Sequence, residues 1–330
     1  MPERGIIDFD PRADIKLKVG GKGAGSVVFG ACSRALSRAS PVFERMLYGN
    51  FIEARSRQAE GDEWIVELPE DKAEPFIVFL QIAHCRFNKV EKKLRLDLLY
   101  DLTVLTNYYD CTRLLEPWMG AWMSGMEDEM RKSSLNMAKA LWISWEFGRK
   151  ENFSRIARRM LMDSEGGMAI DDAIFLDLKM PPDIIERITA IRTQTIQALL
   201  DVCHDMVDNL LVVDEKPRWC RYAEWMGPHR CESMILGSLT FCLARAGLWP
   251  LPTPEDVPDS IVGLHRKMTG LIIHDIGEIP GTKPAVDHRG CNPGPYLLNE
   301  VEAIFKDIPS PITKFHLDQM DRQAKRLTQA

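Results

Sequence analysis

The 330-residue chain has an ordinary globular composition, with 45% hydrophobic and 27% charged residues, so disorder is not expected. Its formal net charge of -6 provides no basic surplus, which argues against nucleic acid as a direct ligand. The N-terminal stretch lacks the basic head and apolar core of a secretory signal, and no apolar run approaches membrane-spanning length. The sequence therefore predicts a cytoplasmic or nuclear protein without a membrane segment, whose eight cysteines are not a disulfide framework.

Strand signals are confined to the first part of the chain. Ile15, Leu17 and Val19 alternate with two lysines, and a glycine-rich stretch separates them from the apolar residues 27–30. This pattern predicts a strand, a turn and a second strand. Residues 64–68 alternate in the same way and predict a third.

Helix signals lie between and after these strands. Ser40 followed by Pro41 predicts a capped helix that ends near Gly49, because serine accepts from free backbone amides and proline suits the first helical turn. Asp71 and Glu74 have the spacing of a capping box, which predicts the start of another helix. A further apolar face closes this part of the chain near residue 115.

Beyond residue 115 the apolar periodicity indicates almost only helix, arranged as antiparallel hairpins. The longest segment follows two prolines and keeps a helical period over the residues Ile184, Ile188, Ile191, Leu199, Cys203, Met206 and Leu210. Cys242 lies on a similar apolar face, so both cysteines are expected in the core. The sequence thus predicts an α+β protein with a tail over 1–13, a mixed module over 14–115 and an all-helical domain over 116–330.

Residues 14–115 resemble a BTB/POZ domain. The resemblance is carried by "DIKLKVGG", "VVFGACSRALSRASPVFERML", "IVELPEDKAEPFIVFLQIAH" and "LLYDLTVLTNYYDCTRLL" in that order, and the helical remainder is similar to that of fungal BTB proteins with long helical C-terminal regions. Two features depart from the family: Cys32 replaces the usual histidine, and only thirteen residues precede Asp14. Long BTB domains use an N-terminal extension to form a strand-swapped dimer, so we expect this chain not to form that dimer.

The resemblance implies non-catalytic protein association, as a substrate adaptor of a cullin-type ubiquitin ligase or as a transcription-linked scaffold. Cullin-binding members carry an apolar-x-acid motif after the capped helix, and Phe51-Ile52-Glu53 matches it in place and type. These three residues are the candidate partner-binding segment. In the alternative interpretation Phe51 packs beneath its own loop and Glu53 is merely solvated.

A zinc site is the second candidate feature. His288 and Cys291 are separated by two residues in a turn-rich loop, and Cys220 and Cys231 lie in or beside loops upstream. Three thiolates and one imidazole would complete a closed tetrahedral site of the kind that structural zinc occupies. The alternative is a set of ordinary buried thiols.

One enzymatic alternative competes for the same region. His274-Asp275 resembles the metal-binding step of HD-type phosphohydrolases, in which imidazole and carboxylate hold a metal that activates water. His229 would then supply an upstream histidine. Four prolines interrupt the intervening segment, and Glu278 stands where that family favours lysine, so the sequence favours a protein that is not an enzyme.

Overall fold

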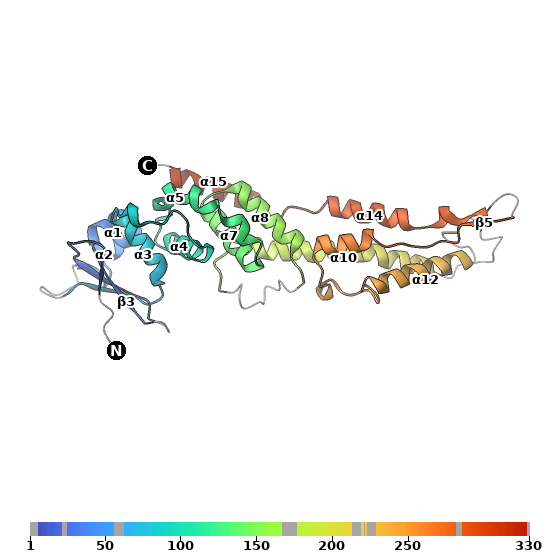
Figure 1. Ribbon diagram of the computed structural model, residues 1–330, viewed down its shortest axis with the longest axis horizontal. Coiled ribbons are helices and arrows are strands. Elements are labelled where there is room, and N and C mark those ends of the chain that lie inside the picture. Colours follow the sequence, from blue (N-terminus) through green and yellow to red (C-terminus); the bar gives the residue numbers. More distant parts are fainter. Residues whose placement is uncertain are drawn as a thin grey trace. The chain divides into compact units, whose positions relative to one another are not determined.

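The computed structural model describes residues 6–21, 25–55, 63–166, 177–212, 219–220, 222, 229–281 and 286–328 (Figure 1). The chain forms two compact units. Unit 1 comprises residues 1–156, 177–181 and 312–330, and unit 2 comprises residues 157–176 and 182–311. A four-stranded sheet in the N-terminal part is followed by a helical region, which confirms the predicted α+β class.

The sheet of unit 1 contains β1 (Ile7–Asp8), β2 (Ile15–Val19), β3 (Val27–Ala31) and β4 (Ile65–Leu68), in the order β1-β3-β2-β4. β2 and β3 form the expected antiparallel hairpin, whereas β1 pairs in parallel with β3 and β4 in parallel with β2. The alternation on β2 has a physical cause: its apolar residues are buried, while Lys16 and Lys18 form ion pairs with Glu63 and Glu67. Residues 22–24 of the predicted glycine-rich turn lie outside the described residues.

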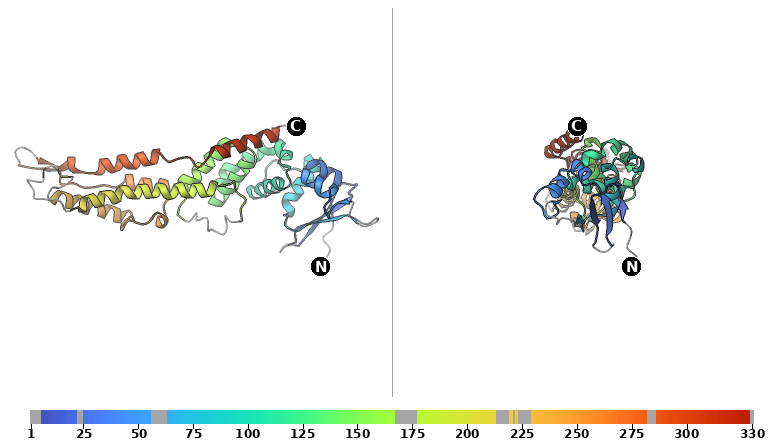
Figure 2. Two further views of the ribbon diagram at one scale, coloured as in Figure 1. Left: turned by 180° about the vertical axis from the view of Figure 1, so that it is seen from behind. Right: turned by 90° about the vertical axis from the view of Figure 1, so that its left-hand side faces the viewer.

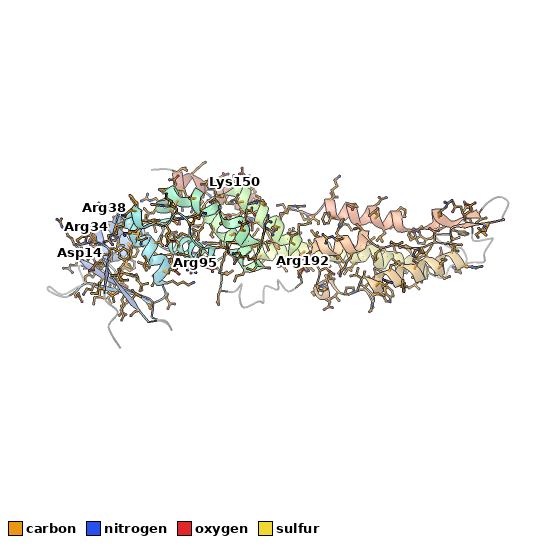
Figure 3. All side chains as sticks on the ribbon, in the orientation of Figure 1. Asp14, Arg34, Arg38, Arg95, Lys150 and Arg192 are labelled. Atoms are coloured by element: carbon orange, nitrogen blue, oxygen red, sulfur yellow. The ribbon has the colours of Figure 1, made fainter. Side chains whose placement is uncertain are left out.

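Three helices lie on one side of this sheet: α1 (Ser33–Ala39), α2 (Pro41–Tyr48) and α3 (Ala73–Ala83) (Figures 1 and 2). Asp14, labelled in Figure 3, accepts hydrogen bonds from the backbone N–H and the hydroxyl of Ser33 at 2.7 and 2.6 Å, and this ties the start of β2 to α1. Ser40 accepts from the Phe43 N–H, so the predicted serine cap of α2 is confirmed. The Ser40 hydroxyl also donates to the carbonyl oxygen of Tyr109 at 2.6 Å.

An aromatic cluster forms the centre of unit 1. Phe43 stacks on Tyr109 with ring centroids 4.5 Å apart, and Phe76 and Phe79 pack against both rings. Burial of these large apolar side chains favours folding of this part of the chain.

The predicted capping box at the start of α3 is wrong. Lys72 is the N-cap residue, and no side chain caps the helix. Asp71 instead accepts a hydrogen bond from the Tyr109 hydroxyl at 2.6 Å, and Glu74 forms an ion pair with Arg95. Both carboxylates therefore bind residues distant in the sequence, and neither caps the helix.

The other described elements of unit 1 are helical: η2 (Phe87–Lys89), α4 (Leu96–Tyr108), η3 (Thr112–Leu115), α5 (Glu116–Met123), α6 (Met126–Met130), α7 (Ser134–Glu146), the start of α8 (Lys150–Asp163) and α15 (Lys314–Thr328). α15 lies against α7 and η3. The approach is close at Gly148, which has φ +61°, because a Cβ there would meet the backbone of Ala324 and Met320 at 2.8 and 2.9 Å.

The described elements of unit 2, besides the end of α8, are α10 (Ile184–Leu211), α12 (Arg230–Arg245), η4 (Pro254–Asp256), α13 (Ile261–Thr269), β5 (Glu278–Ile279), β6 (Val286–Asp287), η5 (His288–Cys291) and α14 (Gly294–Lys306). α10 runs beside α12 and α14 (Figures 1 and 2). All seven residues of the apolar stripe predicted on α10 are buried. Arg192, labelled in Figure 3, donates to the carbonyl oxygen of Asp259 at 2.8 Å. Within the described residues, no helix has the length and apolarity needed to cross a membrane.

Candidate metal centre and partner-binding segment

The four side chains proposed as zinc ligands come together in unit 2. The sulfur atoms of Cys220, Cys231 and Cys291 and a ring nitrogen of His288 all lie within 4.8 Å of one another. Zinc bonds of about 2.3 Å to sulfur and about 2.0 Å to nitrogen place tetrahedral ligand atoms roughly 3.5–3.8 Å apart. Contraction of the cluster by about 1 Å along its longest edge would therefore satisfy that geometry.

Local structure explains why His288 and Cys291 face the same side. Both lie on η5, a 3₁₀ turn, and side chains three residues apart are eclipsed in such a turn. The Asp287 side chain accepts from the Arg289 N–H and caps the turn, and the His288 N–H donates to the carbonyl oxygen of Gly277 at 2.8 Å. The turn directly follows β6, and this hydrogen bond joins it to the residue before β5, so the β5–β6 hairpin fixes its position.

The other two ligands come from distant parts of the chain. Cys231 lies in the first turn of α12 and is fully buried, and Cys220 lies eleven residues before it and is partly exposed. Cys220 Sγ lies 3.7 Å from Nδ1 of His288, so this ring nitrogen faces the thiols. Nε2 of His288 is buried, and no hydrogen-bond partner for it is found among the described residues.

The electrostatics of the cluster favour either neutral thiols or a bound cation. Burial raises the pKa of Cys231, and the neighbouring thiols of Cys220 and Cys291 raise it further. Burial likewise raises the pKa of Cys220. Three thiolates in such proximity repel one another, whereas a divalent cation would reverse this effect and stabilise each thiolate.

A buried carboxylate supports the segment that carries Cys220. Glu232 follows Cys231 on α12 and is buried, and its Oε1 accepts from the Trp219 N–H at 2.6 Å. Nδ1 of His229 lies 3.5 Å from the second oxygen. Sequence reasoning missed Glu232; the available signal was an acidic residue directly beside a proposed ligand on a helix.

The residues of the enzymatic alternative are arranged differently. Asp275 accepts from the Gly277 N–H and from the side-chain amide of Asn292, at 2.8 and 2.9 Å. The exposed His274 donates its backbone N–H to Ser238. Among the described residues, neither belongs to a group of three or more ligand side chains.

The other cysteines differ in burial. Cys203 is buried on α10 as predicted, but Cys242 is only half-buried. Its thiol instead lies 2.9 Å from the carbonyl oxygen of Ile272 and donates to it. The expectation of a core position for Cys242 is therefore wrong.

The segment after α2 leaves its helix abruptly. The Gly49 N–H bonds to the Arg45 carbonyl oxygen, and a Cβ at Gly49 would lie 2.3 Å from that oxygen. Only glycine fits this approach without displacement of the backbone. α2 therefore ends where the sequence predicted, and the chain turns away from its axis.

Phe51 and Ile52 project from this segment into solvent, with exposed fractions of 56% and 82%. The segment itself is anchored, because Ala54 is fully buried and the Trp64 indole N–H donates to the Glu53 carbonyl oxygen at 2.8 Å. The interpretation in which Phe51 packs beneath its loop is therefore wrong. Glu53 is half-buried, and its side chain is not needed for the bond to Trp64.

Comparisons with known proteins gave no match to any family model and none to a curated protein.

Proposed function

We propose that this chain is a non-catalytic protein-interaction protein, an adaptor or scaffold in which residues 14–115 form a BTB/POZ-like module. Phe51, Ile52 and Glu53 contact the partner. The resemblance implies a cullin as that partner, and hence a role as substrate adaptor of a ubiquitin ligase in the cytoplasm or nucleus. A transcription-linked scaffold is the second role that the resemblance implies.

The observation that carries this proposal is the exposure of two adjacent large apolar side chains on an anchored segment. Exposed apolar groups on a fixed backbone favour partner binding, because little conformational entropy is lost when they are buried. The order of elements over residues 15–108 also supports the proposal. An antiparallel hairpin, two short helices, a strand parallel to the first and two longer helices follow one another as the resemblance implies.

The test is capture of a purified cullin scaffold by the full chain. Phe51→Ala with Glu53→Lys is expected to abolish capture, since truncation of an aromatic anchor typically costs at least about 2 kcal/mol of binding. The melting temperature should remain nearly unchanged, because neither side chain is needed to hold the segment. Phe87→Ala is the matched control, since Phe87 has a similar exposed fraction of 54% and lies elsewhere.

Capture that survives the double substitution would contradict the role of this segment. Failure of the wild-type protein to capture any cullin would remove the ligase role and leave a general interaction module. The HD-type phosphohydrolase alternative has less support, because among the described residues neither His274 nor Asp275 belongs to a group of three or more side chains that could hold a metal. Phosphodiesterase activity that is lost in His274→Ala would reverse that preference.

We also propose that Cys220, Cys231, His288 and Cys291 hold a structural zinc ion. The supporting observation is that four side chains of zinc-binding type, from three separate segments, lie within 4.8 Å and are largely buried. Three sulfurs and one nitrogen form a closed set with no position left for a substrate, as in structural rather than catalytic sites. Elemental analysis should find one zinc per chain, and Cys291→Ser should lower that content. Absence of stoichiometric zinc from freshly purified protein would contradict the proposal.

A further inference from the structure

A groove in unit 1 has a chemistry that the proposed function does not account for. It has a volume of about 640 Å³ and lies between α2, the turn that joins β4 to α3, and α4. Its apolar lining includes Val42 and Met46 of α2 and Val104 and Leu105 of α4. A lining of this kind can accommodate aliphatic or aromatic side chains of a partner.

The border of the groove is strongly acidic. Six carboxylates line it, against two lysines: Glu53, Glu67, Glu70, Asp71, Asp101 and Asp177. Lys72 forms an ion pair with Asp101 at 2.7 Å, and Lys18, beside the groove, forms one with Glu67 at 2.8 Å. Lys179 donates to the neutral amide of Asn107 and keeps its charge, so the six carboxylates face three lysines. The groove therefore presents an excess of negative charge beside an apolar surface, which complements a ligand that is both cationic and apolar.

Two tyrosines add to this complementarity. Tyr108, the last residue of α4, lines the groove with an exposed fraction of 68%. An exposed aromatic face attracts ammonium and guanidinium groups. Tyr109 beside it is buried and donates to Asp71, so this carboxylate is held in place before a ligand arrives.

We propose that this groove binds an extended segment of a partner protein in which lysine or arginine side chains flank an apolar residue. The apolar residue contacts α2 and α4, and the cations contact the acidic border and the Tyr108 ring. This inference rests on the proposed interaction function and names the chemistry of the partner: because Glu53 lines the groove, the partner that covers Phe51 reaches it.

The experiment is selection of a phage-displayed random peptide library on the full-length protein. Recovered peptides are expected to be enriched in lysine and arginine next to leucine, isoleucine or aromatic residues. As synthetic fluorescent peptides, they should bind more weakly as salt rises, since electrostatic attraction at an exposed border is screened. Recovery of neutral or acidic peptides, or of none, would overturn the proposal.

A charge-reversal variant locates the binding surface. Glu67→Lys with Asp177→Lys, two exposed positions on the border, should weaken binding of the recovered basic peptides by at least about tenfold. Glu63→Lys with Glu151→Lys is the matched control, because it changes net charge equally at exposed positions outside the groove. Equal loss in both variants would indicate nonspecific attraction and overturn the proposal.

Failure of the groove and failure of the proposed function give different results. If cullin capture depends on Phe51 but no basic peptide binds at the groove, the groove proposal alone fails. If basic peptides bind and are lost in the reversal variant while capture is insensitive to Phe51→Ala, the proposed function alone fails.

Discussion

Glu146 is expected to make the stability of unit 1 depend on pH. Its carboxylate is buried at the end of α7, where burial raises its pKa from near 4.5 to about 7, while hydrogen bonds from Thr112 and Asn107 oppose that rise. The charged groups nearby are Lys179, which lowers the pKa, and Asp110, which raises it. A rise from 4.5 to about 7 corresponds to roughly 3 kcal/mol of free energy.

The sign follows from proton binding. The folded state binds this proton more tightly than the unfolded chain does, so the contribution to stability is fully present below pH 4.5. It falls as the pH rises and is lost above about pH 7. In Glu146→Gln the side chain is neutral throughout, so the stability of this variant relative to wild type should increase by roughly 3 kcal/mol from pH 4.5 to pH 8.

Hydrogen exchange of the α7 amides, followed by mass spectrometry, measures the opening free energy in both proteins. Comparison at each pH cancels the intrinsic exchange rates and every other titrating group. A constant offset is expected as well, because glutamine has a single acceptor oxygen. With that oxygen accepting from Thr112 in place of Oε1, the NH2 group replaces Oε2 and faces the donor NH2 of Asn107. A difference between the two proteins that does not change with pH would refute the raised pKa of Glu146.

Four further outcomes are expected. Removal of metal by a chelator should speed amide exchange in residues 286–297 and in the first turn of α12 but not in α7. An equal increase in the exchange rate in all these segments would contradict a local metal site. Gly148→Ala should cost about 2 kcal/mol or more in thermal unfolding, because the Cβ would overlap the α15 backbone, whereas Gly120→Ala has open space and should not destabilise. Phe43→Ala should lower the free energy of unfolding by about 3–5 kcal/mol, whereas Phe51→Ala, at an exposed position, should lower it by less than about 0.5 kcal/mol. Equal losses in the two variants would contradict the difference in burial between Phe43 and Phe51. Deletion of residues 1–9 should leave the oligomeric state measured by sedimentation unchanged, since β1 pairs with β3 of the same chain. A dimer that dissociates on this deletion would contradict the expectation that no strand-swapped dimer forms.

The elements predicted correctly depend on interactions between neighbours in sequence. The Ser40 cap and the stop at Gly49 involve residues within one helical turn, and the apolar stripe of α10 is a property of one helix. Two of the four candidate ligands, His288 and Cys291, are likewise neighbours in sequence, because they share one 3₁₀ turn.

The failures arise where a distant residue competes for a local partner. Asp71 had the spacing of a helix cap, but its carboxylate accepts a hydrogen bond from the hydroxyl of Tyr109, thirty-eight residues later. Glu146 is an acidic residue at the end of an apolar helix, and only tertiary packing brings Thr112, Asn107 and Gln323 to it. No local pattern in the sequence predicts such encounters.

The return of α15 to unit 1 has a consequence for biosynthesis. The ribosome completes residues 1–156 long before it reaches residue 312. At about 5–20 residues per second, translation of the intervening segment takes roughly 8–30 s. During that interval the surface around Gly148 and Glu146 lacks the helix that later covers it. The nascent N-terminal unit therefore exposes this surface until α15 is translated, and a premature stop codon near residue 312 would remove a helix from the unit that was translated first.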